Sequence, residues 1–306
     1  MAVLARSRTD ATTPPLSPVD SVTVETYDGT QLAARYFAPL GPARGAALIV
    51  PAMGVPQSFY GAFARWLASR GFHAVTFDYR GMGLSRTGSL RGMRTDIVTW
   101  AELDTAAVLR VLERRAPGVP VTWIGHSLGG QIIPFVRDRG RVEKIVTIAT
   151  GSGYWRENAR PLRHKVWLLW WLAAPVATAL VGYFPGRALR MVGDLPAGVI
   201  RQWRRWCLDP EYAVGAEGPE VRALFARVTT PITSLSFTDD EMMSAANIES
   251  IHGMYVGAHR VLRRIAPGDV GLARIGHFGF FRAEHEPLWS RVVEHELAVA
   301  PHAVAS

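Results

Sequence analysis

The 306-residue chain has little cysteine and lacks an apolar segment at its start. Cys207 is the one cysteine, so an intramolecular disulfide is impossible and nothing favours an oxidising compartment. The first eighteen residues are polar and proline-rich and lack the apolar run of a secretory signal. We therefore expect a loose N-terminal tail over residues 1–18 and a cytoplasmic protein.

Lysine is also scarce, because only Lys144 and Lys165 among the 34 basic residues are lysines. The formal net charge is +8, and a basic surface can attract nucleic acid or an anionic membrane. The arginines are scattered, however, and no nucleic-acid-binding motif accompanies them, so no nucleic-acid partner is expected. Apolar residues make up 48% of the chain, which is enough for a large core and argues against disorder.

Segments with the pattern of strands alternate with segments of helical periodicity along most of the chain. An opening hairpin is expected at 21–28 and 32–39, around Gly29. Further strands are expected at 46–50, 73–79, 119–125, 144–149, 232–237 and 261–265. Helices are expected at 58–70, 96–115, 128–137, 245–255 and 284–296. This order predicts an α/β fold with a mostly parallel eight-stranded sheet flanked by helices.

Residues 125–129 read Gly-His-Ser-Leu-Gly between an expected strand and an expected helix. A sharp strand-to-helix turn lifts a serine oxygen clear of the sheet, and small residues such as Gly125 and Gly129 avoid clashes there. The N–H groups of the following helix would face a developing oxyanion. We predict that Ser127 is a nucleophile, with an ordinary turn serine as the alternative. His126 points elsewhere on so tight a turn and is expected to pack or hydrogen-bond nearby.

With this motif the chain resembles the α/β hydrolases over nearly all of its length beyond the tail. A second segment, Phe77-Asp-Tyr-Arg-Gly-Met-Gly-Leu-Ser85, is similar to the family's Asp-x-Arg-Gly-x-Gly-x-Ser turn after the fourth strand. The string Gly-His-Phe-Gly-Phe-Phe at 276–281 resembles a set of bacterial predicted hydrolases. The resemblance implies the α/β-hydrolase fold, serine-hydrolase chemistry and a structural role for the second segment.

The resemblance also implies a general base for Ser127. A serine hydroxyl loses its proton as it attacks, so the base must come within about 2.6–3.2 Å. The family places its histidine in the loop between the last strand and the last helix, where His277 lies in this sequence. The other histidines near this loop belong to expected helices or their ends: His252, His259, His285 and His295.

The third member implied by the family is a carboxylate that follows an earlier strand, in the order serine, acid, histidine. The segment Thr238-Asp-Asp-Glu-Met242 directly follows the strand expected at 232–237. The family usually has a proline or small residue four positions after the acid, and Ser244 stands four after Asp240. We therefore predict Asp240, with Asp239 as the alternative. The aspartate that is not used is expected to cap the next helix or face solvent.

An oxyanion hole is implied by the same resemblance. One donor is the backbone N–H of Leu128, and the other comes from the loop after the third strand, which reads Val50-Pro-Ala-Met-Gly-Val-Pro56. Alignment with the family makes the backbone N–H of Met53 this second donor. The loop departs from the usual His-Gly-x, since Pro51 replaces the histidine and Ala52 the glycine, but a backbone donor survives such changes.

Residues 152–228 interrupt the alternation, because only helices are expected there. We interpret 152–228 as a helical lid inserted into an α/β-hydrolase core formed by 19–151 and 229–306. Six of the ten tryptophans lie in it: Trp155, Trp167, Trp170, Trp171, Trp203 and Trp206. Most are expected to pack the lid against the core, and some to line an apolar pocket roof that favours hydrophobic acyl groups.

The lid contains nineteen residues without a charge, 166–184, which by length and hydropathy could form a transmembrane helix. Such a span would place Ser127 and His277 on opposite sides of a bilayer, where they could not meet. Pro175 and Gly182 also interrupt the run. We therefore expect a lid of short helices rather than a membrane span.

The sequence as a whole predicts a serine esterase that cleaves hydrophobic carboxylic esters through an acyl-enzyme, without a metal or organic cofactor. Two alternatives stay open: an acyltransferase that uses the same triad, and a non-catalytic ligand-binding protein of the same fold. The expected partner is a small hydrophobic ester. Peripheral membrane contact through the lid is a further possibility, suggested by the basic and aromatic residues Arg201, Trp203, Arg204, Arg205 and Trp206.

Overall fold

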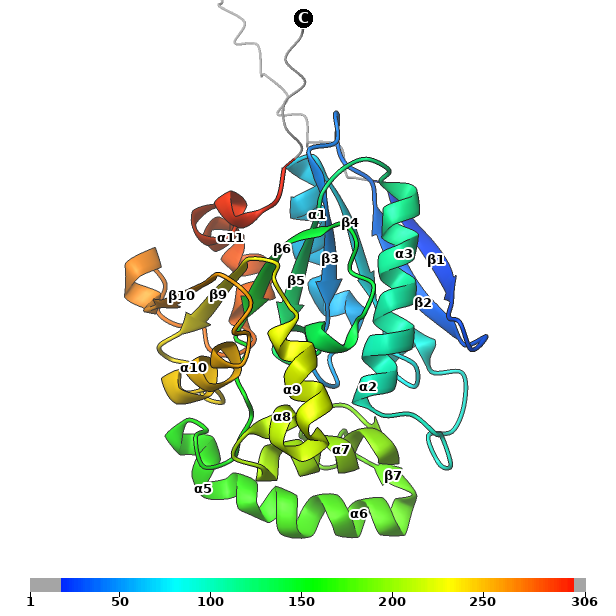
Figure 1. Ribbon diagram of the computed structural model, residues 1–306, viewed down its shortest axis with the longest axis vertical. Coiled ribbons are helices and arrows are strands. Elements are labelled where there is room, and N and C mark those ends of the chain that lie inside the picture. Colours follow the sequence, from blue (N-terminus) through cyan, green and yellow to red (C-terminus); the bar gives the residue numbers. More distant parts are fainter. Residues whose placement is uncertain (1–17, 300–306) are drawn as a thin grey trace, which may run out of the picture.

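The computed structural model of the protein describes residues 18–299 (Figure 1). The tail expected over 1–18 lies outside the described residues except for its last position. The strands of the large sheet are β1 (Val19–Glu25), β2 (Gln31–Phe37), β3 (Gly45–Val50), β4 (Phe72–Phe77), β5 (Val121–His126), β6 (Val142–Ile148), β9 (Ile232–Phe237) and β10 (Arg260–Ile265). All eight expected strands are therefore present within the described residues.

These strands form one sheet in the order β1-β2-β4-β3-β5-β6-β9-β10. β2 is antiparallel to both β1 and β4, and the other neighbouring strands are parallel. Every residue of β3, β5 and β9 is buried, because helices cover both faces of the sheet. The parallel strands end at a common edge, and the predicted site residues follow the ends of β3, β5 and β9 there.

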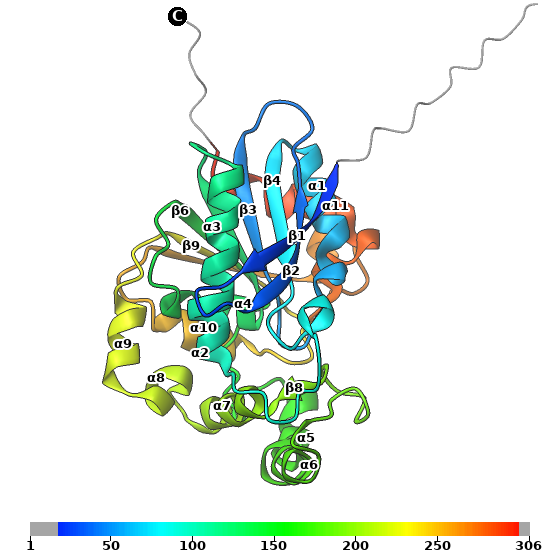
Figure 2. The ribbon, with the colours of Figure 1, turned by 90° about the vertical axis from the view of Figure 1, so that its right-hand side faces the viewer.

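Helices lie on both faces of the sheet, as the side view shows (Figure 2). One face carries α1 (Gly61–Ser69) and α11 (Glu286–Val292), whose apolar side chains share a core cluster. The opposite face carries α2 (Ile97–Thr99), α3 (Ala106–Arg115) and α10 (Ala245–Gly253). The sheet is therefore the middle layer of three, as predicted for an α/β fold.

Two expected helices are shorter than the sequence pattern indicates. The helix expected at 128–137 ends early, since α4 covers Leu128–Gln131 and a 3₁₀ turn follows at Ile133–Phe135. Pro134 explains this, because proline has no N–H and its ring clashes with the carbonyl four residues before it. The helix expected at 284–296 is regular only over α11, between two 3₁₀ turns.

The predicted lid lies together beyond the carboxyl ends of the parallel strands, at the bottom of Figure 1. Its elements are α5 (Arg160–Leu168), a π-helical turn (Leu169–Ala173), α6 (Ala174–Val181), β7 (Tyr183–Phe184), β8 (Leu195–Pro196), α7 (Ala197–Leu208), α8 (Tyr212–Glu217) and α9 (Pro219–Ala226). The hairpin of β7 and β8 was not expected. α5, the π-helical turn and α6 form one continuous helix, Arg160–Val181, so the expected interruption at Pro175 is wrong. This helix is long and apolar enough to cross a membrane by length and composition, and 28% of its most apolar window is buried.

Candidate active site

Ser127 lies in a sharp turn between β5 and α4. Its φ of +48° and ψ of −111° place it outside the regions that non-glycine residues normally adopt, so the turn is strained. A Cβ atom at Gly129 would collide with the carbonyl oxygen of Val50, and one at Gly125 would collide with the backbone of α4. Both glycines of the motif are therefore required for the turn to pack against β3.

His277 and Asp240 meet in the loops that follow β10 and β9. The Nδ1 of His277 lies 2.9 Å from Oδ2 of Asp240, and both side chains are buried. The other carboxylate oxygen accepts hydrogen bonds from the backbone N–H groups of Met242 and Met243, each at 2.8 Å. Because the carboxylate accepts at Oδ2, Nδ1 carries the proton and Nε2 is left as the basic nitrogen of the ring.

Asp239 and Glu241 bind the backbone of the histidine loop rather than the ring. Oδ2 of Asp239 accepts hydrogen bonds from the N–H groups of Ile275 (2.8 Å) and Gly276 (3.1 Å). Oε2 of Glu241 accepts a hydrogen bond from the N–H of His277 at 3.2 Å. The expectation that the second aspartate caps α10 or faces solvent was wrong. All three consecutive acids instead hold the same loop, and only Asp240 reaches the imidazole.

Within residues 18–299 no hydrogen bond joins the hydroxyl of Ser127 to the imidazole of His277. His126 connects their segments instead, because its Nε2 lies 3.1 Å from the carbonyl oxygen of His277. Its Nδ1 lies 2.9 Å from the hydroxyl of Tyr60, which accepts a hydrogen bond from the N–H of Ala52 at 2.9 Å. Catalytic hydrogen bonds often tighten only when substrate binds, so a serine–histidine pair does not require this bond in the free protein.

The protonation of this network follows from burial. Burial lowers the pKa of His126 well below its usual value, so the ring is neutral. Its Nε2 must carry the proton, since a carbonyl oxygen only accepts, and its Nδ1 therefore accepts from Tyr60. The hydrogen bond expected for His126 is present. Tyr60 was missed from the sequence, where it is one aromatic residue among several before α1.

The two predicted oxyanion donors have no acceptor in the part of the chain that the structure describes. Among residues 18–299 the backbone N–H groups of Met53 and Leu128 donate to no protein atom. Their segments are packed together, since Gly129 lies against the backbone of the loop after β3. The hydroxyl of Tyr79 further holds that loop by donating to the carbonyl of Pro51 at 3.1 Å. Free, fixed amide donors are what a developing oxyanion requires.

The turn after β4 supports the loop after β3. The carboxylate of Asp78 accepts hydrogen bonds from the backbone N–H and the side-chain amide of Gln57, at 2.8 and 2.9 Å. Arg80 is fixed in turn by Asp104 (2.7 Å) and Asp28 (2.6 Å). These contacts give the segment 77–85 a structural role, as its resemblance implied.

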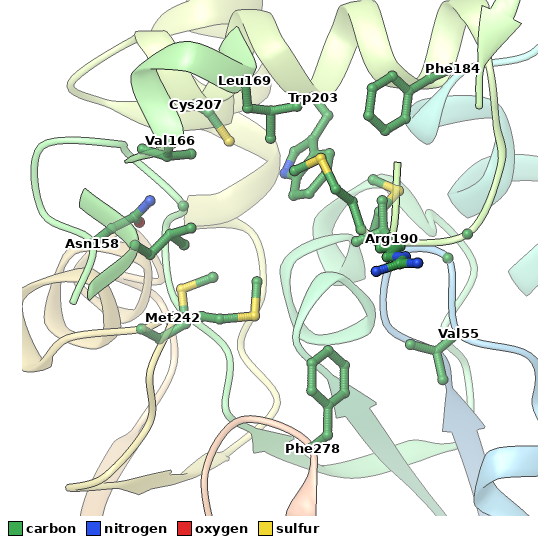
Figure 3. Close-up of a pocket in the computed structure, with 18 of the residues that line it drawn as sticks. Val55, Asn158, Val166, Leu169, Phe184, Arg190, Trp203, Cys207, Met242 and Phe278 are labelled. Carbon is green, nitrogen blue, oxygen red and sulfur yellow. The ribbon is translucent and has the colours of Figure 1, made fainter. Parts of the chain in front are cut away.

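A cavity of about 640 Å³ lies between the site loops and the predicted lid (Figure 3). Met53, the predicted oxyanion donor, lines it from the core together with Met242, two residues after the predicted acid, and Phe278, which directly follows the predicted base. The lining residues from the predicted lid are mostly apolar and include Leu162, Val166, Leu169, Trp170, Phe184 and Trp203. Arg190 is the one charged residue of the lining.

The six tryptophans of the predicted lid divide between inside and outside. Trp170 and Trp203 line the cavity, with ring centroids 5.0 Å apart, and Trp206 is fully buried. Trp167 and Trp171 are 51% and 48% exposed, and Trp155 is half-buried. Within the described residues no group of three or more histidine, cysteine, aspartate or glutamate side chains could hold a metal ion.

The strained serine turn, the histidine–aspartate pair and the sheet order together define an α/β hydrolase. The chain belongs to the family described as serine aminopeptidase, S33 (Hydrolase_4), whose model matches residues 41–200. This match confirms the predicted family of hydrolases.

Curated relatives match part of the chain. A monoglyceride lipase of Saccharomyces cerevisiae is 24% identical over 139 residues, which are 44% of either chain. The protein YfhR of Escherichia coli is 33% identical over 143 residues, which are 44% of this chain and 47% of YfhR. The chain thus spans a little under half the length of these relatives.

Solved structures resemble the whole fold. A thermostable carboxyl esterase of Bacillus coagulans, in complex with glycerol, has a TM-score of 0.55 and 14% identity, covering 81% of this chain and 90% of its own. A soluble variant of the Saccharomyces cerevisiae monoglyceride lipase has a TM-score of 0.57 and 17% identity, covering 85% of this chain and 88% of its own. At these identities the likeness shows the α/β-hydrolase fold.

Proposed function

We propose that the protein hydrolyses carboxylic esters with a hydrophobic acyl group, through an acyl-enzyme formed on Ser127. The observation that carries this proposal is the hydrogen bond between His277 and Asp240 beside the strained serine turn, at the edge of an apolar cavity. Each of these groups would be unnecessary in a protein that only binds a ligand.

In the proposed mechanism, Ser127 attacks the ester carbonyl while Nε2 of His277 takes its proton. Asp240 keeps the other ring nitrogen protonated and stabilises the imidazolium that forms. The N–H groups of Met53 and Leu128 bind the oxyanion. His277 then gives the proton to the leaving alcohol and activates water, which releases the acid and frees Ser127.

The lining of the cavity supports a neutral, hydrophobic substrate. No carboxylate lines it, and Arg190 is an exposed cation. A peptide with a free amino terminus carries a positive charge that would have to be desolvated there without a counter-ion. We therefore favour an ester over the peptide that the family description suggests.

We further propose that the protein is cytoplasmic and touches membranes through the outside of the lid. Six large apolar side chains are exposed there and are named here the outer lid face: Trp167, Leu168, Trp171, Leu172, Val176 and Leu180. No aspartate or glutamate occurs in residues 158–193. Five exposed cations lie in the same segment of the chain: Arg160, Arg163, Lys165, Arg187 and Arg190. An apolar face accompanied by cations suits the surface of an anionic bilayer.

Initial rates on p-nitrophenyl esters from acetate to palmitate test the proposed activity, with Ser127→Ala as the matched control. We expect turnover that rises with acyl length and then levels off, and a loss of at least about 10⁴-fold in Ser127→Ala. A wild type without turnover on any ester, with or without added alcohol or amine acceptors, would contradict both hydrolysis and acyl transfer. Turnover only with an acceptor would favour the acyltransferase.

A further inference from the structure

A buried side-chain oxygen in the cavity lining has no hydrogen-bond partner among the described residues. Asn158 lies between β6 and α5 and lines the cavity from the lid side (Figure 3), although only 4% of its surface is exposed. Within the described residues its Oδ1 is buried and makes no hydrogen bond. A buried amide without a partner destabilises a protein by about 1–3 kcal/mol, so such groups are rare unless something else binds them.

The backbone around Asn158 is fixed to the loop that carries the predicted acid. The N–H of Ala159 donates to the carbonyl of Met242 at 3.1 Å. The hydroxyl of Ser244 donates to the carbonyl of Glu157 at 2.5 Å. The backbone on both sides of Asn158 is therefore fixed at the boundary between lid and core. The residues that fix it, Met242 and Ser244, follow Asp240 by two and four positions. A side chain in so rigid a place is suited to selecting a ligand.

The surroundings restrict what this amide can bind. The other polar lining residues, Ser58 and Arg190, are exposed, whereas Asn158 is set among apolar side chains such as Leu162 and Val166. A charged group would lose its hydration there without gaining a counter-ion. A hydroxyl both donates and accepts, so it can satisfy either end of the amide. The indole N–H of Trp170 is a second buried group in this lining without a partner.

We infer that Asn158 is a specificity-determining residue that binds an uncharged hydroxyl of the substrate. The substrate is then an ester with an apolar body and a hydroxyl at a distance from the ester group, on the acyl chain or on the alcohol. This inference rests on the proposed esterase function, but the recognition step can be measured without catalysis.

Two pairs of isosteric esters test the inference and separate the two positions of the hydroxyl. Ethyl ω-hydroxydecanoate is compared with ethyl undecanoate for the acyl side, and ethylene glycol monodecanoate with propyl decanoate for the alcohol side. We expect the wild type to favour the hydroxylated ester of one pair by about three- to ten-fold in kcat/KM. We expect Asn158→Leu to reduce that ratio to about one. Equal ratios in wild type and variant, in both pairs, would overturn the inference.

Two controls separate recognition from folding. Leu162→Met changes the same cavity wall without changing its polarity, so it should keep the ratio of the wild type. Asn158→Leu should unfold at the temperature of the wild type or higher, because it removes an unpaired amide. A lowered Tm together with an unchanged ratio would assign Asn158 a structural role and overturn the inference.

A binding measurement distinguishes failure of the inference from failure of the proposed function. The fluorescence of Trp170 and Trp203, which line the cavity, reports binding of decanediol and undecanol to Ser127→Ala. If no ester is hydrolysed but decanediol binds more tightly and Asn158→Leu abolishes the difference, the esterase proposal falls and the hydroxyl site stands. If esters are hydrolysed but neither assay shows a preference that depends on Asn158, the hydroxyl site falls and the esterase proposal stands.

Discussion

The core side and the lid side of the cavity differ in how far their polar groups are satisfied. On the core side, His277, Asp240, His126 and Tyr60 are all buried and all hydrogen-bonded. On the lid side, Oδ1 of Asn158 has no hydrogen-bond partner among residues 18–299. The outside of the lid also exposes large apolar side chains to solvent. The four side chains named on the core side thus have partners within the protein, although the backbone N–H groups of Met53 and Leu128 stay free, whereas the lid has polar and apolar surface that the described residues do not cover.

This difference suggests that the core and the lid have different functions. Groups that move protons must be held close to their working geometry before substrate arrives, which requires closed hydrogen-bond networks on rigid strands. Groups that select a substrate gain most when the ligand satisfies them, so an unpaired amide is useful there. Chemistry is expected to depend on the core, and substrate choice and location on the lid.

The largest expected effect separates the two neighbouring aspartates of the core. Asp240→Asn should lower kcat by about 10³- to 10⁴-fold, because the amide no longer holds the imidazole in its working tautomer. Asp239→Asn should lower kcat by less than about ten-fold, since Asp239 binds only the loop backbone. Steady-state kinetics of both variants provide the comparison. Equal losses, or the larger loss in Asp239→Asn, would reverse the assignment of the acid.

Acid should destabilise the core through His252. Burial lowers its pKa to about 4 from 6.5, and its Nε2 lies 2.8 Å from the Thr147 hydroxyl. Between these two values the unfolded chain binds a proton that the folded chain does not, so stability falls as the pH falls. At pH 5 the effect is about 2 kcal/mol. Urea unfolding at pH 7 and pH 5 measures this change in the free energy of unfolding. In His252→Gln the change between the two pH values should be smaller by the same amount. An unchanged pH dependence in His252→Gln would exclude His252 as the cause.

Tyr60→Phe tests whether the hydrogen-bond network of the core contributes to rate. The change leaves the N–H of Ala52 and Nδ1 of His126 unpaired, which should destabilise the fold by about 1–3 kcal/mol. We expect kcat to fall by about ten-fold with KM within about two-fold of the wild type, because the loops lose their relative positions. Tyr36→Phe, at a tyrosine paired with His73 far from the site, is the control. Equal kcat in all three proteins would show that the network only stabilises the fold.

The smallest effect on rate is expected on the outer lid face. The double change Trp167→Ser and Leu180→Ser should leave kcat/KM for short, water-soluble esters within about two-fold of the wild type. It should also abolish association with vesicles that contain anionic lipid, measured by co-sedimentation. Arg156→Ser, which changes an exposed cation outside the face, should retain association. Vesicle binding that survives the double change would separate the lid from any membrane contact.

The prediction of the acid shows the limit of sequence reasoning here. The consecutive residues Asp239, Asp240 and Glu241 follow a strand that the sequence predicted correctly. Which of them faces the ring depends on how the loop after β9 meets the loop before α11. The structure brings Asp240 to His277, and its neighbours to the backbone of the same loop. The spacing of residues along the chain does not predict how these two distant loops contact each other.

The local sequence pattern was enough to predict the strands and the strained turn, because each is determined within a few residues. Alternating and continuous apolar runs predicted all eight strands, and the glycines around Ser127 predicted the strained turn, since both depend on neighbouring side chains. The part played by Tyr60, the hold of Asp239 on the histidine loop and the unpaired amide of Asn158 depend on contacts between segments far apart in the chain. Burial and partners are properties of the packed molecule, so these became visible only once the sheet, its loops and the lid were placed together.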